Sequence, residues 1–169
     1  MIYKISEEEV STLENLISTT SKSKDNQEEQ LTETQDYINN RRYVLPDIDI
    51  EYYSTDNKEL NKKLSEILKV DDVVPITIHK FKYENGAHSK RHNDVNSNQT
   101  FVIILEDDYE GGDFYLNDEL TDFRNRGDVA TYVGKESPHY VTPITKERRV
   151  ILTLSPFSKN LNTLRILTS

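Results

Sequence analysis

The run YENGAHSKRHND, residues 83–94, places His92 and Asp94 one residue apart in a chain that contains four histidines. In an extended strand, residues i and i+2 point to the same side, so both side chains would face one cavity. A further ligand must come from elsewhere, and His139 is the candidate; two histidines and one carboxylate suit non-haem Fe(II). Taken alone, however, His-x-Asp is more typical of a solvated turn than of a metal site. The presence of His139 later in the chain strengthens the metal interpretation only a little.

The composition limits the classes of protein to consider. A length of 169 residues fits a single domain, residues 1–169. The net charge of −9 argues against a nucleic acid as partner. The absence of cysteine excludes disulfides and thiolate metal sites and fits a cytoplasmic location. No apolar run reaches the length of a bilayer, so no membrane span is expected.

The first part of the chain, residues 1–74, has mostly helical patterns. Apolar residues recur at a helical period in ISEEEVSTLENLIS (5–18) and KELNKKLSEILK (58–69), and a further helix is expected at about 27–40. Ser6 and Glu9 form a capping-box pattern at the start of the first helix. Pro46 interrupts a strand pattern that lies between the last two helices.

The second part, residues 75–156, has the pattern of short β-strands. The expected strands are PITIHKFKY, TFVIIL, DFYL, DVATYV and RRVILTLS. The clusters EDDYEGG, LNDELTDFRNRG and GKESPH separate them and are expected to be turns. Closely spaced strands without intervening helices predict a sandwich or small barrel. The fold class is therefore α+β, mainly β, with an N-terminal helical layer packed on a β core.

The order of motifs in residues 75–156 resembles the prolyl-4-hydroxylase-type branch of the 2-oxoglutarate/Fe(II)-dependent dioxygenases. The matching elements are Tyr83, Gly86, His92 and Asp94, the apolar strand TFVIIL, the turn EGGD, the strand GDVATYV, and His139 followed ten residues later by Arg149. This order and spacing are far more specific than any single motif. The resemblance covers about half the chain and does not extend to the N-terminal part.

The resemblance implies a double-stranded β-helix, a jelly-roll-like core supported here by N-terminal helices. It implies that His92, Asp94 and His139 bind Fe(II). It also implies that Arg149 binds the distal carboxylate of 2-oxoglutarate, a task that suits the planar guanidinium fork. Tyr83 is a candidate second contact to this cosubstrate. Weaker candidates for lining the same pocket are Thr142 and Thr153.

The last predicted strand supports the assignment of Arg149. Arg149, Ile151 and Thr153 alternate with residues 150, 152 and 154, so one set should face the barrel interior and the other the helical layer. A charged residue in the interior set needs a partner, because a lone buried charge is costly. A bound dicarboxylate would supply that partner.

The implied reaction is hydroxylation of a C–H bond with Fe(II), 2-oxoglutarate and O₂, and ascorbate is compatible with this cofactor set. The carboxylate of Asp94 favours hydroxylation over halogenation, since related halogenases lack it. A prolyl residue of a peptide or protein is the preferred substrate; the alternative is a free amino acid or another small molecule. The sequence leaves the oligomeric state open.

Three other classes of protein stay open. A cupin-like metal protein would use the same fold without 2-oxoglutarate and would not need Arg149. A binding module would keep the fold without activity, and a zinc hydrolase would use the same three ligands. His79 is expected to be a partly buried strand residue, and His88 a solvated loop residue.

Two surface features are also predicted. The segments ENGAHSKR (84–91) and LNDELTDFRNRG (116–127) are candidate flexible lids over the site. The cations that would give the site a positive rim are Lys90, Arg91, Arg124 and Arg126. Such a rim would favour a substrate that carries a carboxylate.

Overall fold

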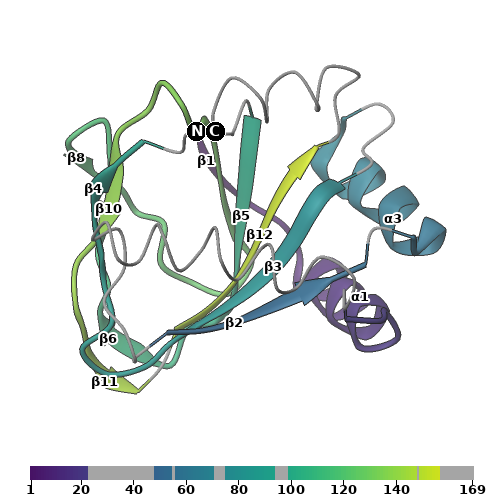
Figure 1. Cartoon of the computed structure of the whole chain (residues 1–169), viewed down its shortest axis with the longest axis horizontal. Helices are drawn as coiled ribbons and strands as arrows, with labels where there is room; N and C mark the ends of the chain where they lie inside the picture. Colours follow the sequence, from purple (N-terminus) through teal and green to yellow (C-terminus); the bar gives the residue numbers. More distant parts are fainter. Residues whose placement is uncertain (23–47, 55, 71–74, 94–98, 148, 157–169) are drawn as a thin grey trace.

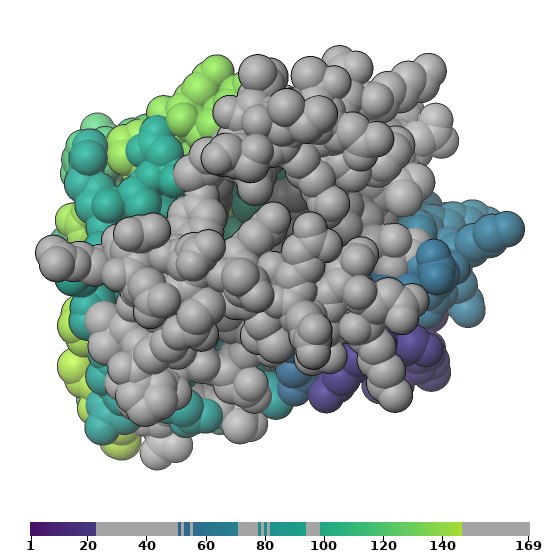
Figure 2. All heavy atoms as spheres, viewed as in Figure 1, coloured from purple at the N-terminus to yellow at the C-terminus, as the bar shows by residue number. Residues whose placement is uncertain are grey.

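The computed structural model describes residues 1–22, 48–54, 56–70, 75–93, 99–147 and 149–156. Its elements form three layers (Figure 1). Helices α1 (Glu7–Ser18) and α3 (Lys58–Leu68) cover one face of a large sheet, and a smaller sheet lies on the opposite side. In the space-filling view, the two helices and the smaller sheet lie at opposite ends of the molecule (Figure 2).

The large sheet is antiparallel throughout. Within the described residues its strand order is β1-β9-β5-β12-β3-β2. The bounds are Ile2–Lys4 for β1, Asp128–Val133 for β9, Gln99–Glu106 for β5, Arg149–Pro156 for β12, Pro75–Tyr83 for β3 and Ile48–Tyr53 for β2. The N-terminal part of the chain therefore contributes two strands to this sheet as well as the helices, and β1 is a strand that the sequence did not predict.

The smaller sheet carries the second half of the sandwich. Its order in the described part of the chain is β4-β10-β7-β8, and a separate pair joins β11 to β6. The bounds are Ser89–His92 for β4, His139–Val141 for β10, Phe114–Leu116 for β7, Glu119–Leu120 for β8, Ile144–Glu147 for β11 and Tyr109–Gly111 for β6. These strands are short, and β4 and β10 carry the candidate histidines.

Local sequence signals explain the two described helices. The Ser6 hydroxyl accepts from the Glu9 backbone N–H, and the Glu9 carboxylate accepts from the Ser6 backbone N–H, which completes the predicted capping box. The Asn57 side chain caps α3 by accepting from the Leu60 N–H. Lys69 ends α3 in the left-handed conformation. The helix predicted at about 27–40 and the interruption at Pro46 lie outside the described residues.

Among the helices that the structure describes, none combines the length and the apolar character that a transmembrane helix needs.

Strand β5 separates two apolar clusters, which explains why TFVIIL is apolar without interruption. Phe101, Ile103 and Leu105 pack with α1 and α3 in a helix-side cluster. Val102 and Ile104 point the other way, into an inner cluster that also contains Tyr83, Phe114 and Val141. A strand that is covered on both faces needs apolar residues at every position, not at alternate ones.

Two short strands occupy segments that the sequence assigned to turns. Strand β6 lies in EDDYEGG, and β8 lies in LNDELTDFRNRG. Asn117 and Asp118 connect β7 to β8 with φ values of 53° and 64°, as in a two-residue type I′ hairpin. Gly111, the last residue of β6, has a φ of +72°, and a Cβ atom there would lie 2.2 Å from the Pro143 carbonyl oxygen. Only glycine fits this position.

Glu51 gives the large sheet a pH-dependent contribution to stability. Burial raises the pKa of Glu51, but the hydrogen bonds from Lys82 and Tyr53 and the charges of Lys82 and Lys22 outweigh burial and lower it from 4.5 to about 2. A carboxyl group with a depressed folded-state pKa stabilises the fold above its unfolded pKa. This contribution is lost as the pH falls from 4.5 toward about 2.

We therefore expect Glu51→Gln to lower the free energy of unfolding at pH 7 by about 1–2 kcal/mol, a value reduced for the partial exposure of the ion pair. Urea unfolding at several pH values would test this. The difference between wild type and variant should shrink below pH 4.5. Glu84→Gln, at an exposed position in the turn after β3, is the matched control and should change little. A deficit for Glu51→Gln that persists unchanged at pH 2 would contradict the ion-pair explanation.

Candidate functional site

His92 and His139 are direct cross-strand partners. His92 ends β4, His139 begins β10, and the register of these antiparallel strands pairs the two residues. Their ring centroids lie 4.3 Å apart, with an angle of 61° between the ring planes. Two residues far apart in the sequence are thus brought together, as the sequence analysis expected.

The hydrogen bonds of the two rings fix which nitrogen carries the proton. The Nδ1 atom of His139 lies 2.7 Å from the Ser137 carbonyl oxygen, and the Nδ1 atom of His92 contacts the Lys90 carbonyl oxygen in the same way. A carbonyl oxygen only accepts, so each Nδ1 donates, and in the neutral ring each Nε2 keeps its lone pair. The Nε2 atom of His92 is also buried.

This arrangement fits a metal site. Histidine ligands typically donate one ring N–H to a carbonyl or carboxylate, which orients the ring and leaves the other nitrogen for the metal. Two adjacent imidazoles with the same tautomer meet that requirement. The donor type also suits Fe(II) and other divalent transition metals.

Asp94 lies outside the described residues. Strand β4 ends two residues before it, at His92. Among the residues that the structure describes, no three histidine or carboxylate side chains form a group that could hold a metal. Asp94 as the third ligand stays a prediction.

Aromatic side chains form the wall behind His139, which is 5% exposed. The Tyr132 ring of β9 lies 4.7 Å from the His139 ring, and the Phe114 ring of β7 lies 6.3 Å from it. Tyr132 was missed by the sequence analysis. The alternation of DVATYV places it on the same face of β9 as Ala130, a member of the inner cluster, and this signal could have identified it.

The strand register places Arg149 opposite Tyr83. Residues that pair directly across antiparallel strands lie on the same face of the sheet, and Tyr83 is a buried member of the inner cluster. Positions 151 and 153 are opposite Ile104 and Val102, which belong to the same cluster. The positions of Arg149, residue 151 and Thr153 are therefore on the inner face, between the two sheets.

Thr142 has a structural partner. Its hydroxyl oxygen accepts from the Asp113 N–H at 2.8 Å, and its own backbone N–H donates to the Asp113 carbonyl at 3.0 Å. These bonds fasten β10 to the turn before β7. A contact between Thr142 and a cosubstrate stays a prediction, as does one involving Thr153.

The other two histidines are not part of the pair. The Nδ1 atom of His88 lies 3.1 Å from the Gly86 carbonyl oxygen, and the side chain is half-buried before β4. His79 lies in β3, where its register partner is Thr153.

Residues 116–127, a candidate flexible lid, are anchored by buried contacts in the structure. Phe123 is 1% exposed and packs edge-on against Phe114, with ring centroids 5.3 Å apart. The Thr121 N–H and hydroxyl both donate to the Phe114 carbonyl oxygen. The Asp128 carboxylate accepts from two further backbone N–H groups of this segment. These contacts hold the segment against the barrel.

The other candidate lid, residues 84–91, is also anchored. Ala87 is fully buried in the inner cluster. The Gly86 N–H donates to the Ile144 carbonyl at 2.6 Å, and the Ile144 N–H donates to the Ala87 carbonyl at 3.0 Å. These two bonds tie Gly86 and Ala87 to Ile144 of β11.

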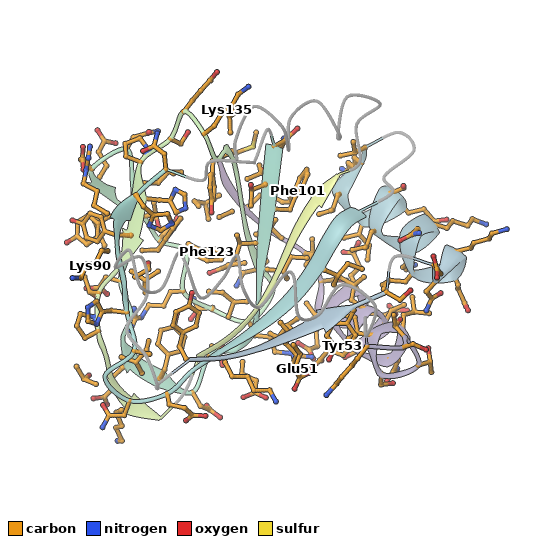
Figure 3. The ribbon with its side chains drawn as sticks, viewed as in Figure 1. Glu51, Tyr53, Lys90, Phe101, Phe123 and Lys135 are labelled. Carbon is orange, nitrogen blue, oxygen red and sulfur yellow. The ribbon has the colours of Figure 1, made fainter. Side chains whose placement is uncertain are left out.

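The prediction of a positive rim is largely wrong, because its three arginines are ion-paired. Arg91 binds both carboxylate oxygens of Asp118. Arg124 pairs with Asp113 and lies over the Tyr109 ring. Arg126 pairs with two carboxylates of α1, those of Glu7 and Glu14. Lys90 is the remaining member; it is exposed on the smaller sheet (Figure 3).

Comparisons with solved structures identify the fold. The viral collagen prolyl hydroxylase of Paramecium Bursaria Chlorella virus-1, solved as a 2OG complex, is 12% identical at a TM-score of 0.62; the match covers 92% of this chain and 93% of that chain. A prolyl hydroxylase from Trichoplax adhaerens, in complex with a hypoxia inducible factor oxygen degradation domain peptide fragment, is 14% identical at a TM-score of 0.58; the match covers 100% and 86%.

A further match, to a 2OG-Fe(II) oxygenase family protein from Burkholderia pseudomallei, has a TM-score of 0.46 and 13% identity, and spans 58% of this chain and half of that chain. No protein-family model and no curated protein sequence matches this chain. The first two likenesses extend over nearly the whole chain, so this chain has the fold of the prolyl hydroxylases. The predicted double-stranded β-helix with supporting helices is confirmed.

Proposed function

We propose that this protein is a 2-oxoglutarate- and Fe(II)-dependent dioxygenase that hydroxylates a C–H bond. The observation that carries the proposal is the pair of imidazoles on β4 and β10. Both rings donate through Nδ1 to the backbone, so each neutral ring carries its lone pair on Nε2, the nitrogen that would bind the metal. A fold shared with prolyl hydroxylases supports the same class of reaction.

In this proposal His92, His139 and Asp94 hold Fe(II). Bound together, the metal and 2-oxoglutarate supply the oxidising chemistry that inserts an oxygen atom from O₂ into the substrate. The chain's own residues bind the metal, orient its ligands and shield them from water. The backbone carbonyls of Lys90 and Ser137 hold the two rings in orientation. The Tyr132 and Phe114 rings keep water away from the inner side of His139.

Arg149 is the proposed anchor for the distal carboxylate of 2-oxoglutarate, and Tyr83 its neighbour in that task. Their positions pair across β12 and β3, on the face that the inner cluster covers. A guanidinium binds a carboxylate through two parallel hydrogen bonds, which fixes both position and angle. A cupin-like protein that does not use 2-oxoglutarate would not need Arg149.

A prolyl residue of a peptide or protein is the proposed substrate, because two of the similar structures are prolyl hydroxylases and one of these is in complex with a peptide fragment. A free amino acid or other small molecule is the second candidate. Succinate formed from 2-oxoglutarate, with Fe(II) and ascorbate present, would be measured with a proline-containing peptide, with free proline and without either. The proposal expects the peptide to give the largest increase. A cytoplasmic location remains a prediction from composition.

Replacing Arg149 with alanine should raise the KM for 2-oxoglutarate about 30-fold. This corresponds to about 2 kcal/mol for a lost charge-assisted hydrogen-bond pair. Arg149→Lys keeps the charge but loses the fork, so its KM should lie between those of wild type and Arg149→Ala. Initial rates at a series of 2-oxoglutarate concentrations would measure this.

Arg148→Ala is the matched control for this experiment, because it removes the same side chain from the neighbouring position. It should leave the KM for 2-oxoglutarate within about twofold of wild type if Arg149 alone anchors the cosubstrate. An unchanged KM in Arg149→Ala, or a larger effect in Arg148→Ala, would overturn the assignment of the cosubstrate anchor.

A further inference from the structure

We infer that Asn93 is a positioning residue that holds the two histidines at the spacing a metal needs; this inference rests on the proposed function. The Asn93 side-chain amide donates to the Lys135 carbonyl oxygen at 2.9 Å. Asn93 directly follows His92, and Lys135 lies in the turn that leads into His139. The bond therefore joins the two chain segments that carry the imidazoles.

The turn at residues 133–138 makes this bond important. Its Ser137 carbonyl accepts from the His139 ring, and its Lys135 carbonyl accepts from Asn93. Backbone N–H groups of Glu136 and Ser137 both donate to the Val133 carbonyl, so the turn is internally closed. One compact turn thus sets the orientation of the His139 ring and anchors the residue beside His92. Figure 3 shows Lys135 at the upper edge of the molecule and Lys90 of β4 at its left edge.

The β-ladder alone holds this region less firmly. The β4–β10 register pairs His139 with His92 and then shifts before the next pair, Val141 with Ser89. Strand β4 ends at His92, so in the described residues the ladder provides no pair beyond the histidines. The Asn93 bond lies immediately past this point. The Asn93–Lys135 bond therefore connects the two chain segments at the end of the histidine pair where the described residues show no further strand pairing.

A metal held between segments that are tied together should be released slowly. Loss of the tie lets the segment after His92 move relative to the turn, so the ligands separate more often. Outer-shell partners of metal ligands typically contribute 10- to 100-fold in metal affinity. Asn93 and Lys135 are both exposed, and an exposed hydrogen bond contributes less than a buried one. We therefore use the lower end of this range of metal affinities. We expect Asn93→Ala to weaken Fe(II) binding about tenfold.

The test is anaerobic calorimetric titration of the metal-free full chain with Fe(II), followed by chase with a chelator to measure the rate of metal release. The variant Asn93→Ala should release Fe(II) about tenfold faster, with its thermal unfolding temperature unchanged in the absence of metal. Lys135→Ala is the sharpest control, because it removes the lysine side chain but keeps the carbonyl that accepts the bond. Asn85→Ala removes an asparagine side chain from another exposed turn. Both controls should match wild type.

The outcomes separate this inference from the proposed function. If wild type binds Fe(II), His92→Ala does not, and Asn93→Ala behaves as wild type, the positioning role is wrong and the metal site stands. If Lys135→Ala releases Fe(II) as fast as Asn93→Ala, the lysine side chain matters and the backbone tie is overturned. If wild type itself fails to bind Fe(II), the proposed function fails, and the inference that rests on it fails with it.

Discussion

Replacing His139 with alanine is expected to weaken the binding of Fe(II) about 100- to 1,000-fold. Structural zinc sites with four ligands have apparent binding free energies of about 10–16 kcal/mol, or about 2.5–4 kcal/mol per ligand. At about 1.4 kcal/mol per factor of ten, the loss of one ligand gives this range. His139 is the more buried ring of the pair and lies against Tyr132 and Phe114.

His88→Ala is a closely matched control for His139→Ala. His88 also contacts a backbone carbonyl two residues earlier through Nδ1, and its ring is half-buried. Unlike His139, His88 does not belong to the ring pair formed by His92 and His139. Fe(II) affinity of His88→Ala should equal that of wild type in an anaerobic titration. Loss of binding in His88→Ala with binding kept in His139→Ala would show that the metal, if bound, lies elsewhere.

Phe123→Ala is expected to destabilise the protein by about 3–5 kcal/mol, the usual cost of deleting a buried phenyl ring. The side chain is 1% exposed, and its edge-on contact with Phe114 adds to the loss. Figure 3 shows Phe123 between the smaller and the large sheet. Removal of the ring would therefore leave a cavity between the smaller sheet and the large sheet. Urea unfolding followed by circular dichroism would measure the change in free energy.

The same loop provides the control for Phe123→Ala. Leu120 is 60% exposed, so Leu120→Ala should change the free energy of unfolding by no more than about 0.5 kcal/mol. Phe114 contacts both Phe123 and His139, so Phe123→Ala should also weaken Fe(II) binding, whereas Leu120→Ala should not. Equal stabilities for the two variants would mean that the segment 116–127 is not anchored by Phe123.

The elements that could be predicted from the sequence are those with a strong local signal. The capping box at Ser6 and Glu9 located the start of α1, and the apolar period of residues 58–69 located α3. Strands β6 and β8 could not be predicted in this way. They are two or three residues long, and their acidic and glycine-rich sequences have the composition of turns. Pairing with β11 and β7 makes them strands, and pairing is a tertiary property.

The histidines of the candidate site could be predicted from the sequence, but the ion pairs and loop contacts around them could not. The motif order identified His92 and His139, and the strand pairing brings them together. The destination of Arg126 could not be foreseen, because its carboxylate partners Glu7 and Glu14 are more than 100 residues away in the sequence. The tie between Asn93 and Lys135 likewise depends on the contact between two loops, which no sequence pattern marks.

The central claim is that the histidine pair, with Asp94, binds Fe(II) and that 2-oxoglutarate chelates this Fe(II). The most direct test is an anaerobic absorbance titration of the metal-free protein, first with Fe(II) and then with 2-oxoglutarate. We predict a weak visible charge-transfer band that needs both additions, disappears in His92→Ala and requires far more 2-oxoglutarate in Arg149→Ala. If Fe(II) binds and no band appears, the protein is not a 2-oxoglutarate oxygenase, and a cupin-like or hydrolytic metal site takes its place. If no Fe(II) binds, the histidine pair is not a metal centre.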